Sequence, residues 1–376
     1  MTDDPAALQR RARALLRPEV YAFYAGGSGH EVTLRANVKA WRRVPLFPRV
    51  LRDVSAVDTS VRVLGSELAT PVAVAPTAFQ CLAHADGEVA SGTGAARAGS
   101  LFVLSTRSTR RIEDVAAAVR GAGGAWWFQV YVMRDRSLTA GLVRRAAAAG
   151  AGALVLTVDT PEPGRKRQNR GDGIVTAPDF LVNIGPGADL AMAEQAADVT
   201  FADIGWLREA SGGLPVLVKG VLRADDAAAC AAHGASGVIV SNHGGRQLDG
   251  AVATAEALPA VAAALRGSPA EIYVDGGIRT GYDVLAALAL GARTVFVGRP
   301  VLWALACGGA EGVRTLLSDL ASGFAHAMTL AGAATVADLE GVAGTAPPPG
   351  AAGAVPPDGE APRRWSGRRA GNSVGE

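Results

Sequence analysis

The stretch PVLVKGVLRADDAAACAAHGASGVIVSN, residues 215–242, decides the fold. PVLVKG at 215–220 and GVIVSN at 237–242 are apolar and β-branched, and the alanine-rich run DDAAACAAH at 225–233 between them is typical of a helix. Near-continuous apolar strands, rather than alternating ones, are typical of a parallel sheet covered by helices. This stretch therefore predicts strand, helix and parallel strand.

Apolar runs of the same kind recur along the chain, with helix-like segments such as Tyr282–Leu290 between them. Eight strand–helix units favour an α/β fold of the closed (β/α)₈ type, the TIM barrel. A doubly wound open sheet is less favoured, because no G-x-G-x-x-G follows any strand and no G-x-x-x-x-G-K occurs. The eight predicted strands are Val72–Pro76, Leu101–Thr106, Trp126–Val132, Ala153–Asp159, Pro215–Gly220, Gly237–Asn242, Glu271–Gly277 and Thr294–Arg299.

Three other segments complete a predicted single barrel domain over residues 1–343. Residues 1–60 precede the first strand and are expected to form a helical cap. Residues 160–214, between the fourth and fifth strands, form a polar, Gly/Pro-rich insertion, and its place after a strand end predicts a lid over the active site. Residues 344–376 are dominated by Pro, Gly and Arg and are expected to be a disordered tail.

Composition excludes several classes of protein. The 376 residues include 37 basic and 35 acidic ones, too even a balance to predict binding to nucleic acid or to a membrane surface. No apolar run approaches the roughly 18 residues that span a bilayer, and the charged N-terminus does not resemble a signal peptide, so we expect a cytoplasmic protein. Three scattered cysteines and five histidines without H-x-x-x-H spacing predict no metal site.

Polar residues gather where the predicted strands end. All strand ends of such a barrel meet at one mouth, so these residues are predicted to be neighbours in space. Each of the eight ends carries a hydrogen-bonding or charged group, which favours an active site over plain packing. The residues are Thr77, Ser105, Gln129, Tyr131, Thr157, Asp159, Lys219, Ser241, His243, Arg246, Asp275, Arg279 and Arg299.

Two motifs at these ends indicate particular ligands. DGGIRTG at 275–281 and VGRP at 297–300 combine glycines with arginine, a pattern that predicts a phosphate site. SNHGGRQLD at 241–249 places a base, His243, near a cation, Arg246, as suits an anion with a removable proton beside it. Lys219 ends an apolar strand, and a buried lysine needs a negative partner.

The chain resembles the FMN-dependent α-hydroxy-acid oxidases and dehydrogenases, a family that includes glycolate, lactate and hydroxymandelate oxidases. SNHGGRQLD carries most of the resemblance, and it is joined in order by PTAFQCLAHADGE (76–88), WFQVYV (127–132), LTVDTP (156–161), VLVKG and DGGIRTG. The match runs from about residue 8 to 340. It implies oxidation of an (S)-2-hydroxy acid to the 2-keto acid, oxygen or another electron acceptor as second substrate, and a homo-oligomer such as a tetramer.

The resemblance also implies roles for individual residues. His243 would be the base, Asp159 would stabilise its protonated form, and Arg246 and Tyr131 would bind the substrate. Lys219 would stabilise the reduced FMN. The other cofactor-binding residues would be Pro76, Thr77, Ala78, Ser105, Gln129, Thr157, Ser241, Asp275, Gly277, Arg279, Gly298 and Arg299. Whether the hydrogen leaves as hydride or as a proton from carbon stays open.

Three positions depart from the family pattern. Phe23 stands where glycolate oxidases have an active-site tyrosine, as in hydroxymandelate oxidases, which favours an aromatic substrate such as mandelate or 4-hydroxymandelate unless Tyr24 takes that place. Lys166 stands where a second substrate-binding arginine is usual, with Arg165 and Arg167 as alternatives. Arg107 replaces a tryptophan and would be a solvated loop residue or a substrate contact.

A protein that binds FMN without catalysing a reaction stays open from the sequence if the substrate clamp at Lys166 is weakened, and so do two alternative activities. One is oxidation of a small aliphatic 2-hydroxy acid, such as lactate or glycolate. The other is a flavin-free barrel enzyme that binds a phosphate. The latter would leave Lys219, His243 and Arg246 unexplained as a set.

Overall fold

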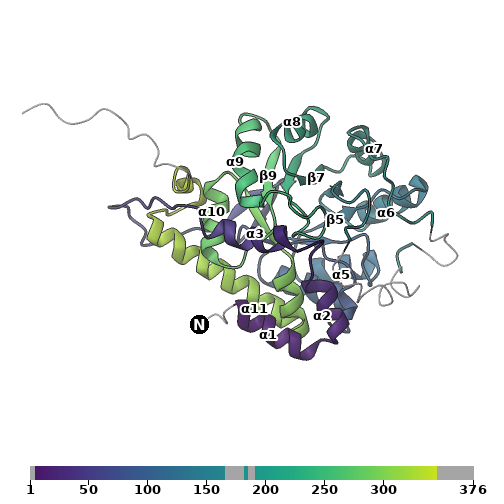
Figure 1. Cartoon of the computed structure of the whole chain (residues 1–376), viewed down its shortest axis with the longest axis horizontal. Helices are drawn as coiled ribbons and strands as arrows, with labels where there is room; N and C mark the ends of the chain where they lie inside the picture. The colour runs from purple at the N-terminus through teal and green to yellow at the C-terminus, as the bar shows by residue number, and fades with distance from the viewer. Residues whose placement is uncertain (1–4, 166–181, 185–190, 345–376) are drawn as a thin grey trace, which may run out of the picture.

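The computed structural model describes residues 5–165, 182–184 and 191–344, and these form a closed barrel of eight parallel strands (Figure 1). Each barrel strand coincides with one of the predicted apolar runs, β7 extending one residue beyond its run to Val221, so the predicted TIM barrel is confirmed and the open sheet is wrong. The barrel strands are β3 (Val72–Val74), β4 (Phe102–Leu104), β5 (Trp126–Val130), β6 (Leu154–Thr157), β7 (Val216–Val221), β8 (Gly237–Val240), β9 (Glu271–Val274) and β10 (Thr294–Val297).

Helices cover the outside of the barrel and bury its outward-facing apolar side chains in one continuous core. The longest of them consists of two helical parts that meet at Gly308 and Gly309, where the backbone is not helical. The helices are α4 (Gly87–Arg97), α5 (Ile112–Gly121), α6 (Arg136–Ala148), α7 (Ala202–Ala210), α8 (Ala224–Ala232), α9 (Thr254–Ala264), α10 (Gly281–Ala289) and α11 (Arg299–Ala331). None of the helices in the described part of the chain combines the length and the apolar character needed to cross a membrane.

The interior of the barrel is a second, separate apolar core. Side chains alternate along a strand, so residues two positions apart point the same way. Val103, Trp127, Leu217 and Tyr273 belong to this inner core. Two positions further along the same strands stand polar residues of the mouth: Ser105, Gln129, Lys219 and Asp275. One alternation therefore fills the barrel and aims the predicted site residues into its mouth.

The N-terminal segment brings aromatic residues to the mouth. It contains the helices α1 (Pro5–Leu15), α2 (Pro18–Ala25) and α3 (Val32–Trp41). Val20 and Tyr24 of α2 pack with Trp303 of α11 in a small apolar cluster, and α1 lies along α11 (Figure 1). Trp41 of α3 donates its indole N–H to the carbonyl of Gly276, 2.7 Å away, and so holds the turn after β9.

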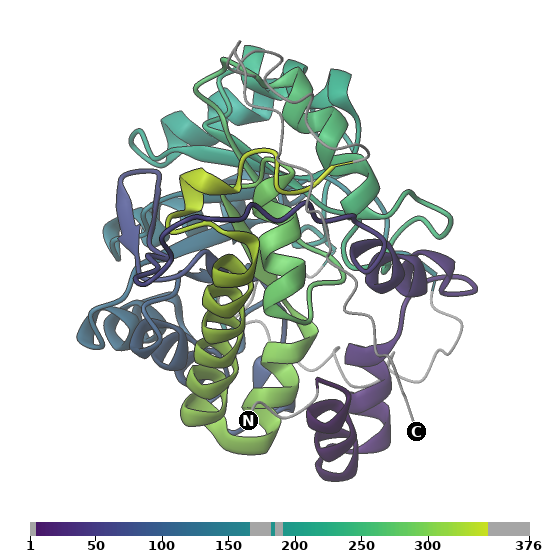
Figure 2. The ribbon, with the colours of Figure 1, turned by 90° about the vertical axis from the view of Figure 1, so that its left-hand side faces the viewer.

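A short hairpin closes the other end of the barrel and was not expected from the sequence. Its strands are β1 (Val61–Val63) and β2 (Ser66–Leu68). Val63 and Leu68 complete the inner core, and the backbone N–H of Leu64 is 3.2 Å from Glu271 Oε2, at the start of β9. Figure 2 shows the hairpin and the N-terminal helices at opposite ends of the barrel.

The expected insertion at 160–214 is only partly described. Its last section contains α7, which packs beside α6 and β7 as one of the outer helices. The chain in excess of a regular strand–helix unit therefore precedes residue 202. Residues 166–181 and 185–190, which carry most of the predicted lid, and all but the first residue of the predicted tail at 344–376 lie outside the described residues. The short 3₁₀ helices η1 (Gln80–Leu82) and η3 (Val336–Leu339) complete the elements.

Candidate active site

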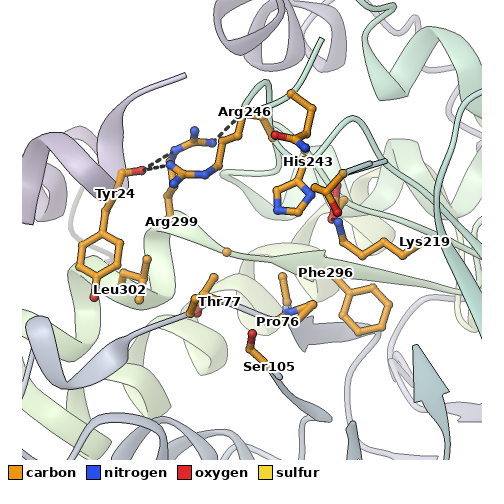
Figure 3. Close-up of a pocket in the computed structure, with 18 of the residues that line it drawn as sticks. Tyr24, Pro76, Thr77, Ser105, Lys219, His243, Arg246, Phe296, Arg299 and Leu302 are labelled. Carbon is orange, nitrogen blue, oxygen red and sulfur yellow. Dashed lines mark hydrogen bonds and ion pairs between the residues drawn. The ribbon is translucent and has the colours of Figure 1, made fainter. Parts of the chain in front are cut away.

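A cavity of about 490 Å³ opens at the carboxyl ends of the barrel strands, within the roughly 300–1,000 Å³ that is usual for ligand pockets. Figure 3 shows His243 and Lys219 at one side, Tyr24 and Leu302 at the other, and Thr77, Pro76 and Ser105 facing Arg246 and Arg299 across it. Most of the predicted site residues line this cavity: Phe23, Pro76, Thr77, Ala78, Ser105, Tyr131, Lys219, His243, Arg246, Asp275, Gly277, Arg279, Gly298 and Arg299.

The remaining predicted residues stand directly behind these, apart from Lys166, which lies outside the described residues. Gln129 links three strands. Its Oε1 accepts hydrogen bonds from Ser105 Oγ at 3.2 Å and from the backbone N–H of Thr106 at 3.1 Å, and its Nε2 donates to Thr157 Oγ1 at 3.0 Å. All these side chains are buried. The result is a fixed row of polar groups beneath one wall of the cavity.

His243 and Asp159 form a hydrogen-bonded pair, with 2.9 Å between His243 Nδ1 and Asp159 Oδ1. His243 has a left-handed backbone, φ 57°, which aims its ring into the cavity from the turn after β8. A bulge at Gly220 in β7 lets Asp159 come close, since a Cβ at Gly220 would lie 2.6 Å from that of Asp159. Burial opposes the charge of Asp159, but His243 and Lys219 outweigh it and lower the pKa of the carboxyl group.

Lys219 is almost fully buried, and a carboxylate and a hydroxyl group contact its amine. Its Nζ lies 3.4 Å from Asp275 Oδ2 and donates to Ser241 Oγ at 3.0 Å. Burial alone would lower the pKa of Lys219, but Asp275 and Asp159 more than compensate, so its pKa is raised and the amine is a cation. The other carboxylate oxygen of Asp275, Oδ1, is buried and has no hydrogen-bond partner among the described residues.

Three arginines, Arg246, Arg279 and Arg299, line the cavity, and Arg246 and Arg299 face Pro76, Thr77 and Ser105 across it (Figure 3). Arg299 begins α11 and donates to the carbonyl groups of Tyr24, Gly26 and Gly244 at 2.8–3.0 Å. Arg279 and Arg246 lie near enough to lower the pKa of Arg299, in addition to the larger effect of burial. Among the described residues none of the three forms an ion pair. Such a cluster at a helix N-terminus, beside the turns after β9 and β10, is suited to a phosphate.

An aromatic wall adjoins the arginines. Arg246 Cζ lies 5.3 Å from the centre of the Phe23 ring, a cation–π contact, and the Phe23 ring packs against Phe79 with 6.2 Å between centres. Tyr24 also reaches the cavity, but its hydroxyl donates to the carbonyl of Phe79 at 2.6 Å. Phe23 therefore presents an apolar ring to the cavity, while the hydroxyl of Tyr24 is already engaged.

Some lining residues were not among the predicted site residues. Arg107 is half-buried and lines the cavity, so its description as a solvated loop residue is wrong. Its place two positions after Ser105, at a strand end, was the available signal. Thr160 and Gln247 also line the cavity, and their places in LTVDTP and SNHGGRQLD were the available signal; Gln195, also in the lining, comes from an irregular segment without one. Arg165, an alternative to Lys166, is exposed and is absent from the lining.

This fold and this cavity define a barrel enzyme that binds a phosphate-bearing cofactor, and comparison with known proteins identifies it further. A family model described as FMN-dependent dehydrogenase matches residues 12–343. The chain is 45% identical over 343 residues to 4-hydroxymandelate oxidase of Amycolatopsis orientalis, covering 88% of this chain and 95% of that protein. It is 42% identical over 346 residues to L-lactate oxidase of a Nostoc strain, covering 88% and 94%.

Solved structures agree with these relatives. A crystal structure of mandelate oxidase has a TM-score of 0.83 and 43% identity to this chain, and the match covers 90% of this chain and 97% of that one. A second mandelate oxidase structure, with (S)-4-hydroxymandelic acid, has a TM-score of 0.80 at 43% identity. The chain belongs to the FMN-dependent dehydrogenase family, and its cofactor is FMN.

The residues present fit FMN on grounds independent of the comparisons. Arg279 and Arg299 form no ion pair among the described residues and stand at or near the N-terminus of α11, which suits a phosphate dianion. The buried Oδ1 of Asp275 lacks a donor, which a hydroxyl of the cofactor's ribityl chain would supply. The cationic Lys219 lies on the opposite side of the cavity from Tyr24 and Leu302, where a flavin ring would gain from positive charge (Figure 3).

Proposed function

We propose that this chain uses FMN to oxidise an (S)-2-hydroxy acid with an aromatic side chain, such as mandelate or 4-hydroxymandelate, to the 2-keto acid. The observation that carries the proposal is the convergence of a His–Asp pair, a free guanidinium edge and a buried lysine on one cavity. Each group matches one requirement of the reaction: a base for the leaving proton, a cation for the substrate carboxylate and a charge beside the cofactor.

FMN, when bound, supplies the acceptor for the two electrons. We assign the backbone at Pro76–Ala78 and the side chains of Ser105, Gln129 and Thr157 to the ring. Lys219 and Ser241 are assigned to its other edge, where the lysine supplies positive charge. Asp275 and Gly277 would hold the ribityl chain, and Arg279, Gly298 and Arg299 the phosphate. The unpartnered Asp275 oxygen and the arginine cluster support these assignments.

His243 is the proposed base, and its geometry selects one nitrogen. An ionised Asp159 can only accept a hydrogen bond, so Nδ1 of His243 carries the proton of the 2.9 Å contact. Nε2 is then the basic nitrogen, and it takes the proton from the substrate. The negative charge of Asp159 stabilises the imidazolium that results and holds the ring in its orientation.

Arg246 is the proposed carboxylate-binding residue. Its hydrogen bonds to the carbonyl groups of Phe23, Tyr24 and Gly26 all come from Nη1. Among the described residues, Nη2 and Nε of Arg246 donate to no acceptor, so this edge of the guanidinium can hold a carboxylate through two parallel bonds. Tyr131 lines the same cavity and is positioned to add a hydrogen bond.

The aromatic wall supports the choice of substrate class. Phe23 and Phe79 offer ring surfaces where glycolate oxidase-like members have a polar tyrosine at the position of Phe23. An aryl side chain would bury apolar area against them at roughly 25 cal/mol per Å². The methyl group of lactate, or the hydrogen of glycolate, would leave most of this surface uncovered. Because some relatives are named for lactate or glycolate, oxidation of a small aliphatic hydroxy acid is the alternative that the experiment must distinguish.

An absorption spectrum under anaerobic conditions tests the proposal. We expect the purified protein to be yellow and to bleach within one turnover when (S)-mandelate is added, with (R)-mandelate as the matched control that leaves the colour. (S)-Lactate at the same concentration should bleach it more slowly. An FMN-loaded protein that (S)-mandelate does not bleach would refute the proposed oxidation, and faster bleaching by lactate than by mandelate would refute the aromatic assignment.

A further inference from the structure

We propose that Arg107 binds a second carboxylate of the substrate, so that the preferred 2-hydroxy acid is an aromatic one whose ring carries a negative charge at the end away from C2. This inference rests on the proposed function and narrows its substrate class. It concerns a cation that the reaction itself does not require, since Arg246 and Lys219 already serve the substrate carboxylate and the cofactor.

The backbone of Arg107 is fixed at the rim of the cavity. Its carbonyl accepts the N–H of Phe79 at 3.1 Å, and its own N–H donates to Ser105 Oγ at 3.1 Å. Two residues on, Thr109 donates from its N–H and its hydroxyl to the buried carboxylate of Glu88, at 3.0 and 2.7 Å. The loop after β4 is therefore tied down on both sides of Arg107, and its side chain starts from a defined point.

The side chain of Arg107 has no acceptor in the part of the chain that the structure describes. It is half-buried and lines the cavity, yet among the described residues its guanidinium forms neither a hydrogen bond nor an ion pair. Lys219, by contrast, has Asp275, and Arg299 has three carbonyl groups. Burial lowers the pKa of Arg107, and the nearby Tyr131 and Glu194, which favour its cation, offset this effect only in part. Holding a cation partly out of water without a partner costs free energy, and an anionic ligand would recover it.

The position of Arg107 separates it from the other substrate cation. In the strand order of the barrel, β4 and β8 stand four places apart among eight, so their ends lie on opposite sides of the mouth. Arg107 follows β4, and Arg246 follows β8. A substrate whose first carboxylate lies on Arg246 thus directs its far end toward the side of Arg107. Gln195 and Thr160, hydrogen-bonded to each other, add polar groups to the lining.

The aromatic wall of Phe23 and Phe79 determines which part of a ligand fits between Arg107 and Arg246. Phe23 and Phe79 line the same cavity as Arg107 and Arg246, so the middle of the ligand meets ring surfaces while both ends meet guanidinium groups. A rigid aryl ring with a para carboxylate matches this order of groups. A purely apolar aryl acid would satisfy the wall and Arg246 but leave Arg107 without an acceptor.

Steady-state kinetics on a matched pair of substrates test the inference. We expect the wild-type holoenzyme to show a kcat/KM for (S)-4-carboxymandelate roughly 10- to 100-fold above that for (S)-4-methylmandelate, as a charge-assisted hydrogen bond would give. Arg107→Met should abolish this preference and leave mandelate and 4-methylmandelate within about twofold, while Arg107→Lys should keep part of it. Arg314→Met, which removes a charge from the exposed ion pair with Glu311 in α11, is the control and should keep the preference.

A binding measurement separates this inference from the proposed function. The keto acids 4-carboxybenzoylformate and 4-methylbenzoylformate can be titrated into the FMN-loaded protein and followed by the flavin spectrum, with no turnover required. Tighter binding of the carboxy compound to wild type, lost in Arg107→Met, supports the inference even if mandelate is not oxidised. Equal binding of the two compounds to wild type, or a preference that survives Arg107→Met, overturns it, even if mandelate bleaches the flavin.

Discussion

The two ends of the barrel are built by the same eight strands and have opposite characters. At the closed end, Trp127 and Tyr273 pack edge to face, with ring centres 5.6 Å apart, in the inner core that the β1–β2 hairpin completes. At the mouth, two positions further along β5 and β9, stand Gln129 and Asp275. One step of strand alternation separates an apolar core from a polar site.

The difference between the ends concerns unsatisfied groups. Near the starts of the strands, the buried side-chain atoms without a hydrogen-bond partner among the described residues belong to neutral groups: Thr70 Oγ1, Trp126 Nε1 and Thr294 Oγ1. At the mouth they are carboxylate oxygens, Asp159 Oδ2 and Asp275 Oδ1, and among the described residues the guanidinium of Arg107 forms no hydrogen bond or ion pair. An incompletely paired buried charge costs more free energy than an unpaired neutral group, so the charged groups at the mouth indicate where ligands bind. We therefore expect substitutions at the mouth to lower activity with little effect on stability, and substitutions at the closed end to lower stability with little effect on activity.

His243→Asn is expected to have the largest effect of any change at the mouth. It should lower kcat/KM for (S)-mandelate by roughly 10³- to 10⁴-fold, because the base and the orientation supplied by Asp159 are lost together. The yellow colour and the unfolding midpoint should stay close to those of wild type. Stopped-flow absorbance gives the rate of bleaching, and chemical denaturation gives the stability.

The matched control is His233→Asn. His233 follows α8 on the surface, where its ring Nδ1 is hydrogen-bonded to the carbonyl of Ala229 and its ring stacks on Phe201. Its replacement should leave the bleaching rate unchanged. A fall in rate of less than tenfold in His243→Asn would remove His243 from the role of base. A large loss of stability in that variant would contradict the expectation that residues at the mouth contribute to activity rather than to stability.

Trp127→Ala tests the closed end and is expected to have the opposite signature. Trp127 is fully buried in the inner core, and truncation should lower the free energy of unfolding by about 3–5 kcal/mol. The kcat of the enzyme that remains folded should stay within about twofold. Urea unfolding and the activity per bound flavin are the two measurements. Phe201→Ala, at a 38% exposed aromatic residue on the outer surface, should cost less than about 1 kcal/mol.

Much of this architecture could be predicted because its signals are local. Each barrel strand is a short apolar run, and the polar residue that ends it, such as Ser105 after FVL or Lys219 after VLV, is adjacent in sequence. Strand alternation then places these residues together without any knowledge of long-range contacts. The predicted site residues at the strand ends were found in this way.

The features that escaped prediction depend on distant contacts. The β1–β2 hairpin has strands of only three residues, and it exists because Val63 and Leu68 fill the open end of the inner core. The sequence also left Arg107 open between solvent and cavity, because its exposure depends on how the loops around it pack. Similarly, the contact of Arg246 with Phe23 joins segments far apart in the chain. Periodicity contains no information on such pairs.

A single strand, β10, allows the last test of the comparison, because an arginine stands at each of its ends. Arg293 precedes β10 and lies 3.6 Å from Glu271 in a half-exposed ion pair near the closed end. Arg299 follows β10 at the mouth and forms no ion pair with any described residue. Methionine at either position removes one charge and keeps a long side chain.

Arg299→Met should weaken the binding of FMN to the apoprotein by roughly 10- to 100-fold, because a charge-assisted bond to the phosphate is lost. Riboflavin, which has the same ring and ribityl chain without the phosphate, should bind both proteins equally. Arg293→Met should change neither affinity, since an exposed ion pair contributes less than about 1 kcal/mol and lies at the other end. Calorimetric titration of both ligands decides the point: an equal loss for riboflavin and FMN in Arg299→Met would mean that Arg299 supports the fold of the mouth rather than the phosphate.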